Sequence, residues 1–136
     1  MQASITTLAA ALMGGIIISF AASWNACAQQ PTIKRTDLAT ADQSATDVGT
    51  MWVGEIAPGG STGRHTHPTP RFVYVVEGSV VLEMDGKPPR TFTVGEGFVE
   101  SPGEVHNLRN ASTTAPAKGI GFQVAPKGTP LQTTVP

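Results

Sequence analysis

The chain of 136 residues contains a single cysteine, Cys27. It lies in an N-terminal segment that we expect to be removed, so neither a disulfide nor a thiol nucleophile can explain the function of the mature protein. Charge is also scarce, because only 14% of the residues are charged and the formal net charge is -1. This balance gives no electrostatic basis for binding nucleic acid or an anionic membrane. The length leaves room for one small domain.

Residues 1–28 contain no Lys, Arg, Asp or Glu. An apolar stretch, Leu8–Ala22, is followed by "NACAQQ", in which alanines flank Cys27 with the small-x-small spacing of a signal-peptidase site. We expect residues 1–28 to be a signal peptide whose cleavage leaves Gln29 as the new N-terminus. This predicts a periplasmic or secreted protein with no membrane attachment after cleavage. An uncleaved membrane anchor and a lipid anchor on Cys27 are the alternatives.

No segment after residue 29 has a helical hydrophobic period with caps. Instead, short runs such as "GTMWVGEI", "RFVYVVEG" and "SVVLEM" are separated by Gly- and Pro-containing turns, and Asp85-Gly86 is a strong hairpin signal. These runs, at intervals of about 8 to 12 residues, are typical of an all-β sandwich or barrel. We therefore expect an N-terminal arm at residues 29–46, a barrel at 47–125 and a C-terminal tail at 126–136.

A barrel of this size has a thin core, so we expect a homodimer that covers one of its sheets. The aromatic residues are the candidates for the core or for that interface. Tyr74 alternates with Val73 and Val75, which places it on the opposite strand face from Arg71 and suggests core or dimer packing. The other candidates are Trp52, Phe72, Phe98 and Phe122.

The sequence contains only three histidines: His65, His67 and His106. Because side chains alternate along a strand, His65 and His67 leave the same face of an extended segment. Two imidazoles on one face match the spacing needed for one metal ion, and His106 follows a tight turn on a different strand. By spacing alone, a solvated surface pair and a hydrogen-bonded filler histidine are equally acceptable interpretations.

Two longer runs carry a family resemblance. "GGSTGRHTHPTPRFVYVVEG" resembles the first motif of the cupin family, in which Gly, His-x-His, Glu and Gly follow at fixed spacing. "GEGFVESPGEVHNLRN" resembles the second motif. The matching residues are Gly59, His65, His67 and Gly78 in the first run, and Gly95, Gly103, His106 and Asn110 in the second, with Ser101 replacing a proline. The resemblance spans about residues 47–125.

The resemblance implies a double-stranded β-helix, or jelly-roll barrel, which agrees with the strand pattern. It also implies that His65, His67 and His106 converge on a divalent metal at the mouth of the barrel. Three imidazoles suit several metals, so the ion could be Fe, Mn, Zn, Ni or Cu.

Arg71 stands where the first cupin motif has its glutamate ligand, and an arginine offers no lone pair to a metal. Three interpretations follow. The centre could use three histidines, as in the thiol dioxygenase branch of the cupins, with Arg71 binding a substrate carboxylate. Glu100 could replace the lost ligand or neutralise Arg71, or else transfer a proton. The site could also have lost its metal.

These residues lead to two hypotheses for the function. The first is a metal-dependent dioxygenase, isomerase or lyase acting on a small organic anion, with Arg71 and Glu100 as the catalytic candidates. The second is a non-catalytic cupin that binds a small molecule or a metal. The fold does not decide between them.

Overall fold

The computed structural model describes residues 32–136. The predicted signal peptide, residues 1–28, lies outside the described residues. Residues 32–136 contain no helix that is long and apolar enough to cross a membrane. The strands are β1 (Ile33–Asp42), β2 (Asp47–Ile56), β3 (His65–Thr66), β4 (Arg71–Glu77), β5 (Ser79–Met84), β6 (Arg90–Thr93), β7 (Gly97–Glu100), β8 (His106–Asn110), β9 (Ala117–Pro126) and β10 (Thr133–Thr134).

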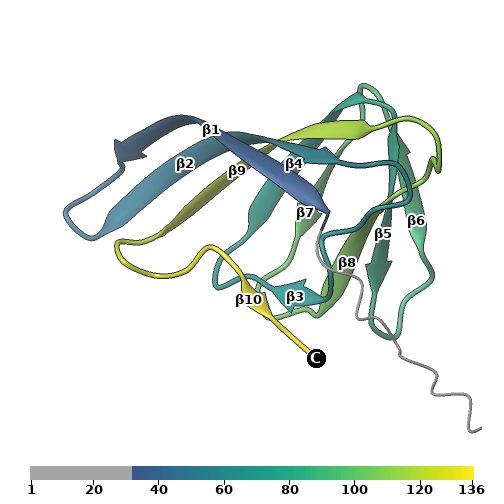
Figure 1. Ribbon diagram of the computed structural model, residues 1–136. Helices are drawn as coiled ribbons and strands as arrows, with labels where there is room; N and C mark the ends of the chain where they lie inside the picture. Colours follow the sequence, from purple (N-terminus) through teal and green to yellow (C-terminus); the bar gives the residue numbers. More distant parts are fainter. Residues whose placement is uncertain (1–31) are drawn as a thin grey trace, which may run out of the picture.

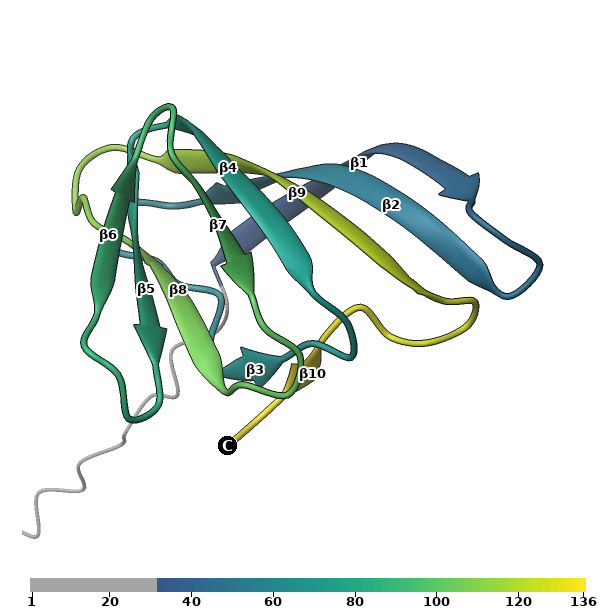
Figure 2. The ribbon, with the colours of Figure 1, turned by 180° about the vertical axis from the view of Figure 1, so that it is seen from behind.

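The strands form two five-stranded sheets with the orders β1-β2-β9-β4-β7 and β10-β3-β8-β5-β6. The pairings are antiparallel, and the two sheets face each other across the interior (Figure 1). The sheet that contains β3 and β8 has the shorter strands and is called the smaller sheet below, and the sheet that contains β2 and β9 is called the larger sheet. From behind, β1, β2 and β9 extend sideways beyond the smaller sheet (Figure 2). This arrangement confirms the all-β jelly-roll predicted from the sequence.

The hydrophobic core lies between the sheets. Its buried members are Ile56, Val75, Val80, Leu82, Phe92, Leu108 and Ala117, with Ile33, Met84 and Phe98 packed against them. The rings of Phe92 and Phe98 stack with their centroids 4.3 Å apart, which joins β6 to β7 across the sheets. The predicted hairpin turn at Asp85-Gly86 links β5 to β6, and Gly86 adopts the positive φ (72°) that such a turn requires.

Strand β4 follows the alternation that its sequence predicts. Arg71 and Val75 are buried toward the interior, whereas Phe72 and Tyr74 are 52% and 49% exposed on the outer face. Of the aromatic residues expected in the core or at an interface, Trp52 is buried on β2, whereas Phe72 and Tyr74 lie outside the core. Their exposure follows from the side-chain period of two, because a buried Arg71 turns both aromatic neighbours outward.

The segments expected as an arm and a tail both contain strands. Residues 29–46 include β1, which pairs with β2 from Ile33↔Ile56 to Asp42↔Val48. Nine of the ten residues of β1 are exposed, so the strand lacks the alternating hydrophobicity by which strands are recognised. The expected tail includes β10, which pairs with β3 (Figure 2). Backbone pairing, not burial of side chains, forms both elements.

Candidate metal centre

The three histidines come together in the smaller sheet. His65 begins β3 and His106 begins β8, and these two residues are direct cross-strand partners. His67 follows β3, and its carbonyl oxygen accepts a hydrogen bond from the backbone N–H of Gly103 at 3.0 Å. Gly103 has φ of 72°, which suits the tight turn before His106. This contact connects the first motif to the second, so all three rings meet with centroids 4.5–4.9 Å apart.

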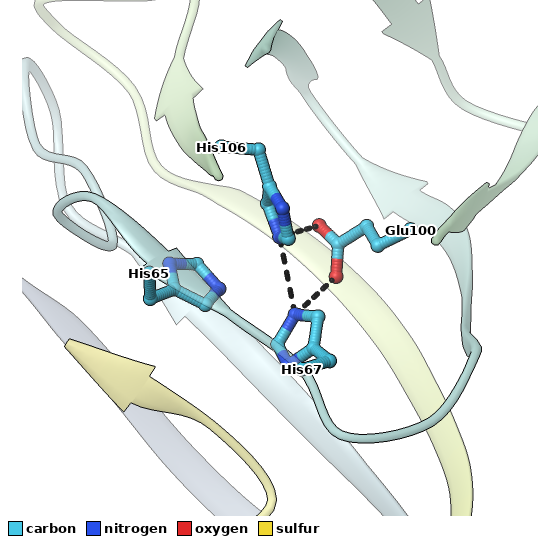
Figure 3. A group of neighbouring side chains, drawn as sticks. All are labelled: His65, His67, Glu100 and His106. Carbon is cyan, nitrogen blue, oxygen red and sulfur yellow. Dashed lines mark hydrogen bonds and ion pairs between the residues drawn. The ribbon is translucent and has the colours of Figure 1, made fainter. Parts of the chain in front are cut away.

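Glu100 enters the same cluster from the opposite sheet. It ends β7 and is the cross-strand partner of Arg71 on β4, so both side chains point inward. Its carboxylate oxygens lie 3.0 Å from Nε2 of His67 and 3.5 Å from Nε2 of His106 (Figure 3). The side chain is 2% exposed. Glu100 therefore lies where it could supply the carboxylate that is missing at position 71.

The backbone fixes the tautomer of each histidine. Nδ1 of His65 donates to the carbonyl of Gly63 at 2.8 Å, and Nδ1 of His106 donates to the carbonyl of Glu104 at 2.8 Å. Nδ1 of His67 donates to the carbonyl of Leu131 at 2.9 Å. Because a carbonyl oxygen only accepts, each Nδ1 carries a proton, and Nε2 presents a lone pair whenever the ring is neutral. Metal-binding histidines are oriented in this way.

These lone pairs converge on one another and on the Glu100 carboxylate. Nε2 of His67 lies 3.1 Å from Nε2 of His106, a separation that repels two lone pairs and requires a proton or a metal cation between them. Nε2 of His65 is buried without a hydrogen-bond partner. Orphaned buried nitrogens are rare in folded proteins, and a metal ion would satisfy this one.

The protonation of the cluster follows from burial and charge. Burial, partly opposed by the Gly63 hydrogen bond, lowers the pKa of His65 to about 4, so its ring is neutral at neutral pH. Burial disfavours the charged forms of His106 and Glu100. Burial is the largest single influence on each pKa, but several smaller ones together outweigh it. Hydrogen bonds and charges from His106, His67 and Arg71 lower the pKa of Glu100. The hydrogen bond and charge of Glu100, with the hydrogen bond to the Glu104 carbonyl, raise the pKa of His106. Glu100 is therefore an ionised carboxylate, which is the form that ligates a cation.

The donor set fits a divalent transition metal. Four ligand atoms from His65, His67, Glu100 and His106 lie within 4.8 Å of one another. Bonds of about 2.0–2.2 Å to one ion place neighbouring ligand atoms about 3.0–3.4 Å apart, close to the separations between His67, His106 and Glu100. Three imidazoles and one carboxylate suit Fe, Mn, Zn, Ni or Cu. The sequence prediction of a metal site thus corresponds to a buried group that could bind an ion.

Arg71 is buried beside this group, and its donors are directed elsewhere. Nε donates to the side chain of Gln123 at 3.1 Å, while Nη1 and Nη2 donate to Gln132 at 3.3 Å and to the Leu131 carbonyl at 3.1 Å. The guanidinium lies over the Trp52 ring and 3.9 Å from Glu100. Burial lowers the pKa of Arg71 to about 10, although Glu100 opposes the shift, so Arg71 remains cationic at neutral pH.

The interior also contains a small, mostly apolar cavity next to the cluster. Its volume is about 50 Å³. His65, Arg71 and Glu100 line one part of the cavity, and the rest is lined largely by apolar side chains and glycines, among them Trp52 and Val75. Such a space accommodates only a few non-hydrogen atoms.

Several residues near the site were only weakly indicated by the sequence. Gln123, on β9, is fully buried, and its amide group is bonded to Arg71 and Thr69. Leu131 and Gln132 lie in the expected tail and were not candidates. Leu131 acts through its backbone carbonyl. Its side chain is not involved, so the residue type at position 131 gives no sign of this role.

The family assignment agrees with this geometry. The family model for the cupin domain matches residues 52–120, from β2 into β9. The chain belongs to the cupin family. The matched region of this cupin contains His65, His67, Glu100 and His106, whereas β1 and β10 lie outside it.

Among curated proteins, this cupin is similar to the tetracenomycin polyketide synthase protein TcmJ of Streptomyces glaucescens. The two are 33% identical over 73 residues, which cover 53% of this chain and 47% of TcmJ. The chain therefore spans about half the length of that relative.

Three solved structures illustrate the shared fold. A cupin-like protein from Thermotoga maritima has a TM-score of 0.59 and 21% identity, covering 71% of this chain and 77% of that chain. The DMSP lyase DddQ from Ruegeria pomeroyi has a TM-score of 0.62 and 18% identity, with coverages of 76% and 51%. Oxalate oxidase in complex with the substrate analogue glycolate has a TM-score of 0.54 and 19% identity, with coverages of 71% and 55%. At these identities, the likeness shows the fold alone.

Proposed function

We propose that this cupin binds a divalent transition-metal ion and uses it to act on a small organic anion. The observation that carries the proposal is the convergence of three Nε2 lone pairs and an ionised carboxylate, with Nε2 of His65 left without a partner. In this proposal, Glu100 replaces the ligand that the cupin motif places at position 71. Its register opposite Arg71 supports the replacement.

A bound ion would supply Lewis-acid or redox chemistry to a ligand oxygen. The histidines and Glu100 hold the ion, and the carbonyls on Nδ1 keep their rings oriented. The positive charge of Arg71 lies beside Glu100 and lowers the cost of an additional anion in a buried site. The apolar wall of the cavity keeps water away from the bound molecule.

The dimensions of the cavity limit the ligand. A space of about 50 Å³ that is mostly apolar favours a compact molecule, with its charged group at the histidine cluster and a short apolar part inside. The fold relative that binds glycolate, a small carboxylate, supports this class of ligand by analogy.

A non-catalytic cupin that binds a metal or a small molecule is the second candidate. One observation favours it: three of the five N–H donors of Arg71 already bond to groups of the protein, which leaves few for a substrate. Oxygen uptake and product analysis with small carboxylates and metal-loaded protein would separate the two candidates. Turnover would exclude the second.

Metal analysis of the purified chain tests the proposal most directly. After reconstitution with Fe²⁺, Mn²⁺, Zn²⁺, Ni²⁺ or Cu²⁺ and removal of free ions, we expect about one ion per chain for at least one metal. His106→Ala should abolish stoichiometric binding, whereas Glu83→Gln on the exterior should not. Near-zero occupancy of the folded wild-type chain for all five metals would contradict the proposal.

We also propose that the chain is exported to the periplasm or secreted, as its uncharged, apolar N-terminal segment suggests. Mass spectrometry of the protein from the source cells should find Gln29 at the N-terminus. A lipid-modified Cys27 or an intact segment of residues 1–28 would contradict cleavage.

A homodimer is proposed through the outer face of the larger sheet. Phe72, Tyr74 and Val99 are about half exposed there and line a groove with Phe122 and Ile120, without a charged residue. A second copy presents the same uncharged surface and so needs no complementary charge. Light scattering should give a dimer mass for the wild type and a monomer mass for Tyr74→Glu. A monomeric wild type at micromolar concentration would contradict this proposal.

A further inference from the structure

One backbone carbonyl contacts two residues of the candidate metal centre. The carbonyl oxygen of Leu131 accepts hydrogen bonds from Nδ1 of His67 at 2.9 Å and from Nη2 of Arg71 at 3.1 Å. The neighbouring Gln132 side chain accepts from Nη1 of Arg71 at 3.3 Å. Both acceptors belong to residues 127–135, which we call the C-terminal strap. They lie outside the region that matches the cupin domain.

Backbone contacts outside Leu131 and Gln132 also hold the strap against the barrel. At its start, the N–H of Lys127 donates to the carbonyl of Thr46 at 2.8 Å, and at its end the N–H of Val135 donates to the carbonyl of Arg64 at 2.9 Å. Between these points β10 pairs with β3, where Thr134 lies opposite His65 (Figure 1). The strap thus borders the His-x-His segment along the edge opposite β8.

The three histidines differ in where their orienting carbonyl comes from. His65 and His106 each bond to a carbonyl two residues earlier, on Gly63 and Glu104. His67 bonds to Leu131, which is 64 residues later in the chain. Detaching the strap therefore removes the orienting contact of His67 and leaves the other two intact.

We propose that the C-terminal strap is a positioning element of the metal centre. The Leu131 carbonyl holds His67 in the tautomer with the proton on Nδ1, so that Nε2 is available to an ion. Together with Gln132, it also fixes the guanidinium of Arg71 beside Glu100. The effect on metal affinity rests on the proposed function, whereas the effect on the His67 tautomer does not. Loss of a carbonyl that orients a ligating histidine typically weakens metal binding 10- to 100-fold.

The test uses two ways of detaching the strap. One variant lacks residues 130–136. The other, Val135→Pro, keeps the full chain but removes the N–H that donates to Arg64. A third variant, Gln132→Ala, removes an acceptor of Arg71 but leaves the Leu131 carbonyl that contacts His67. The control, Thr134→Ala, changes an exposed side chain in β10 of the strap. Side-chain ¹⁵N NMR of the metal-free protein reads the tautomer of His67, and competition with a chelator measures the affinity for Zn²⁺.

We expect His67 to carry its proton on Nδ1 in the wild type and to populate both tautomers in the detached variants, while His65 is unchanged. Zinc affinity should fall roughly 10- to 100-fold in the detached variants and change less than about twofold in Thr134→Ala. Gln132→Ala, which loosens Arg71 only, should leave the His67 tautomer unchanged and lower zinc affinity less than the detached variants do. An unchanged His67 tautomer in a folded detached variant would overturn the proposal, and so would an altered tautomer with undiminished zinc affinity. If the wild type binds no zinc or other metal, the proposed function fails, and the tautomer alone decides the role of the strap.

Discussion

The interior of the barrel has two ends that are built from the same strands and differ in chemistry. At one end, Val75 of β4, Leu82 of β5 and Leu108 of β8 form an apolar core. At the other end, β4 and β8 contribute Arg71 and His106, which are equally buried. Burial depth alone therefore does not distinguish the part that stabilises the fold from the part that could bind a metal.

The two ends contribute to stability in different ways. Burying a leucine side chain stabilises a fold by about 1.5–3 kcal/mol. Burying an arginine, a glutamate and three histidines costs desolvation, which hydrogen bonds and ion pairs offset only in part. We therefore expect mutations at the apolar end to change the stability of the fold, and mutations at the polar end to change metal binding.

The largest effect is expected at the apolar end from Leu82→Ala. Leu82 is 1% exposed in the core, so its truncation should lower the free energy of unfolding by about 2–5 kcal/mol. Urea unfolding measures this change, and Val94→Ala, at a 59% exposed residue, is the matched control. The folded fraction of Leu82→Ala should keep its metal stoichiometry. A loss of metal binding by this folded fraction would mean that the two ends are coupled.

At the polar end, Glu100→Gln should lower metal affinity at least tenfold, which corresponds to about 1.4 kcal/mol. The substitution keeps the size of the side chain but removes the ionised carboxylate from His67 and His106. Isothermal titration with Zn²⁺ measures the change. An unchanged affinity would exclude Glu100 as the replacement ligand and favour a centre of three histidines.

A smaller effect of opposite sign is expected from Arg71→Met. This substitution removes a buried cation that lies 3.9 Å from Glu100, so it should tighten metal binding by about 1 kcal/mol, or roughly fivefold. If instead the affinity falls, the main role of Arg71 is to hold the surrounding side chains in place. The same titration distinguishes these outcomes.

The smallest effect is expected on the exterior, at the ion pair of Glu83 and Arg109. The hydrogen bond from Arg109 lowers the pKa of Glu83 from its ordinary value of 4.5, although burial opposes the shift. The pair therefore stabilises the fold above that pH, and the stabilisation disappears as the pH falls through the lowered pKa. Glu83→Gln should cost about 0.2–1 kcal/mol at pH 7 in urea unfolding and nothing near pH 2. A larger cost at pH 7 would indicate a network beyond this pair.

Much of the fold could be predicted from the sequence. The alternating runs give β2, β4 and β5, and Asp85-Gly86 marks the β5–β6 turn, because each signal is local. Strand β1 carries no such signal, since nearly all of its side chains are exposed and only its backbone pairs with β2. A strand held by main-chain hydrogen bonds alone leaves little trace in a hydrophobic pattern.

The sequence was enough to name the candidate side chains of the site, but it did not predict the strand registers that bring them together. His65, His67 and His106 follow from motif spacing. Glu100 could be named as a replacement carboxylate, but its orientation depends on the pairing of β7 with β4, which joins residues far apart in the chain. The Leu131 carbonyl could not be identified at all, because every amino acid at position 131, proline included, would offer the same backbone oxygen.

Strand β1 has a consequence for how the molecule avoids aggregation. It is the longest edge strand of either sheet, whereas β6, β7 and β10 have four residues or fewer. A long unpaired edge invites another chain to add a strand. Here the edge carries Lys34, Arg35 and Asp37, and the register shifts between Asp37 and Ala39. Charges and an irregular register both oppose edge-to-edge growth into fibrils, so the proposed dimer would form on the apolar outer face and not along this edge.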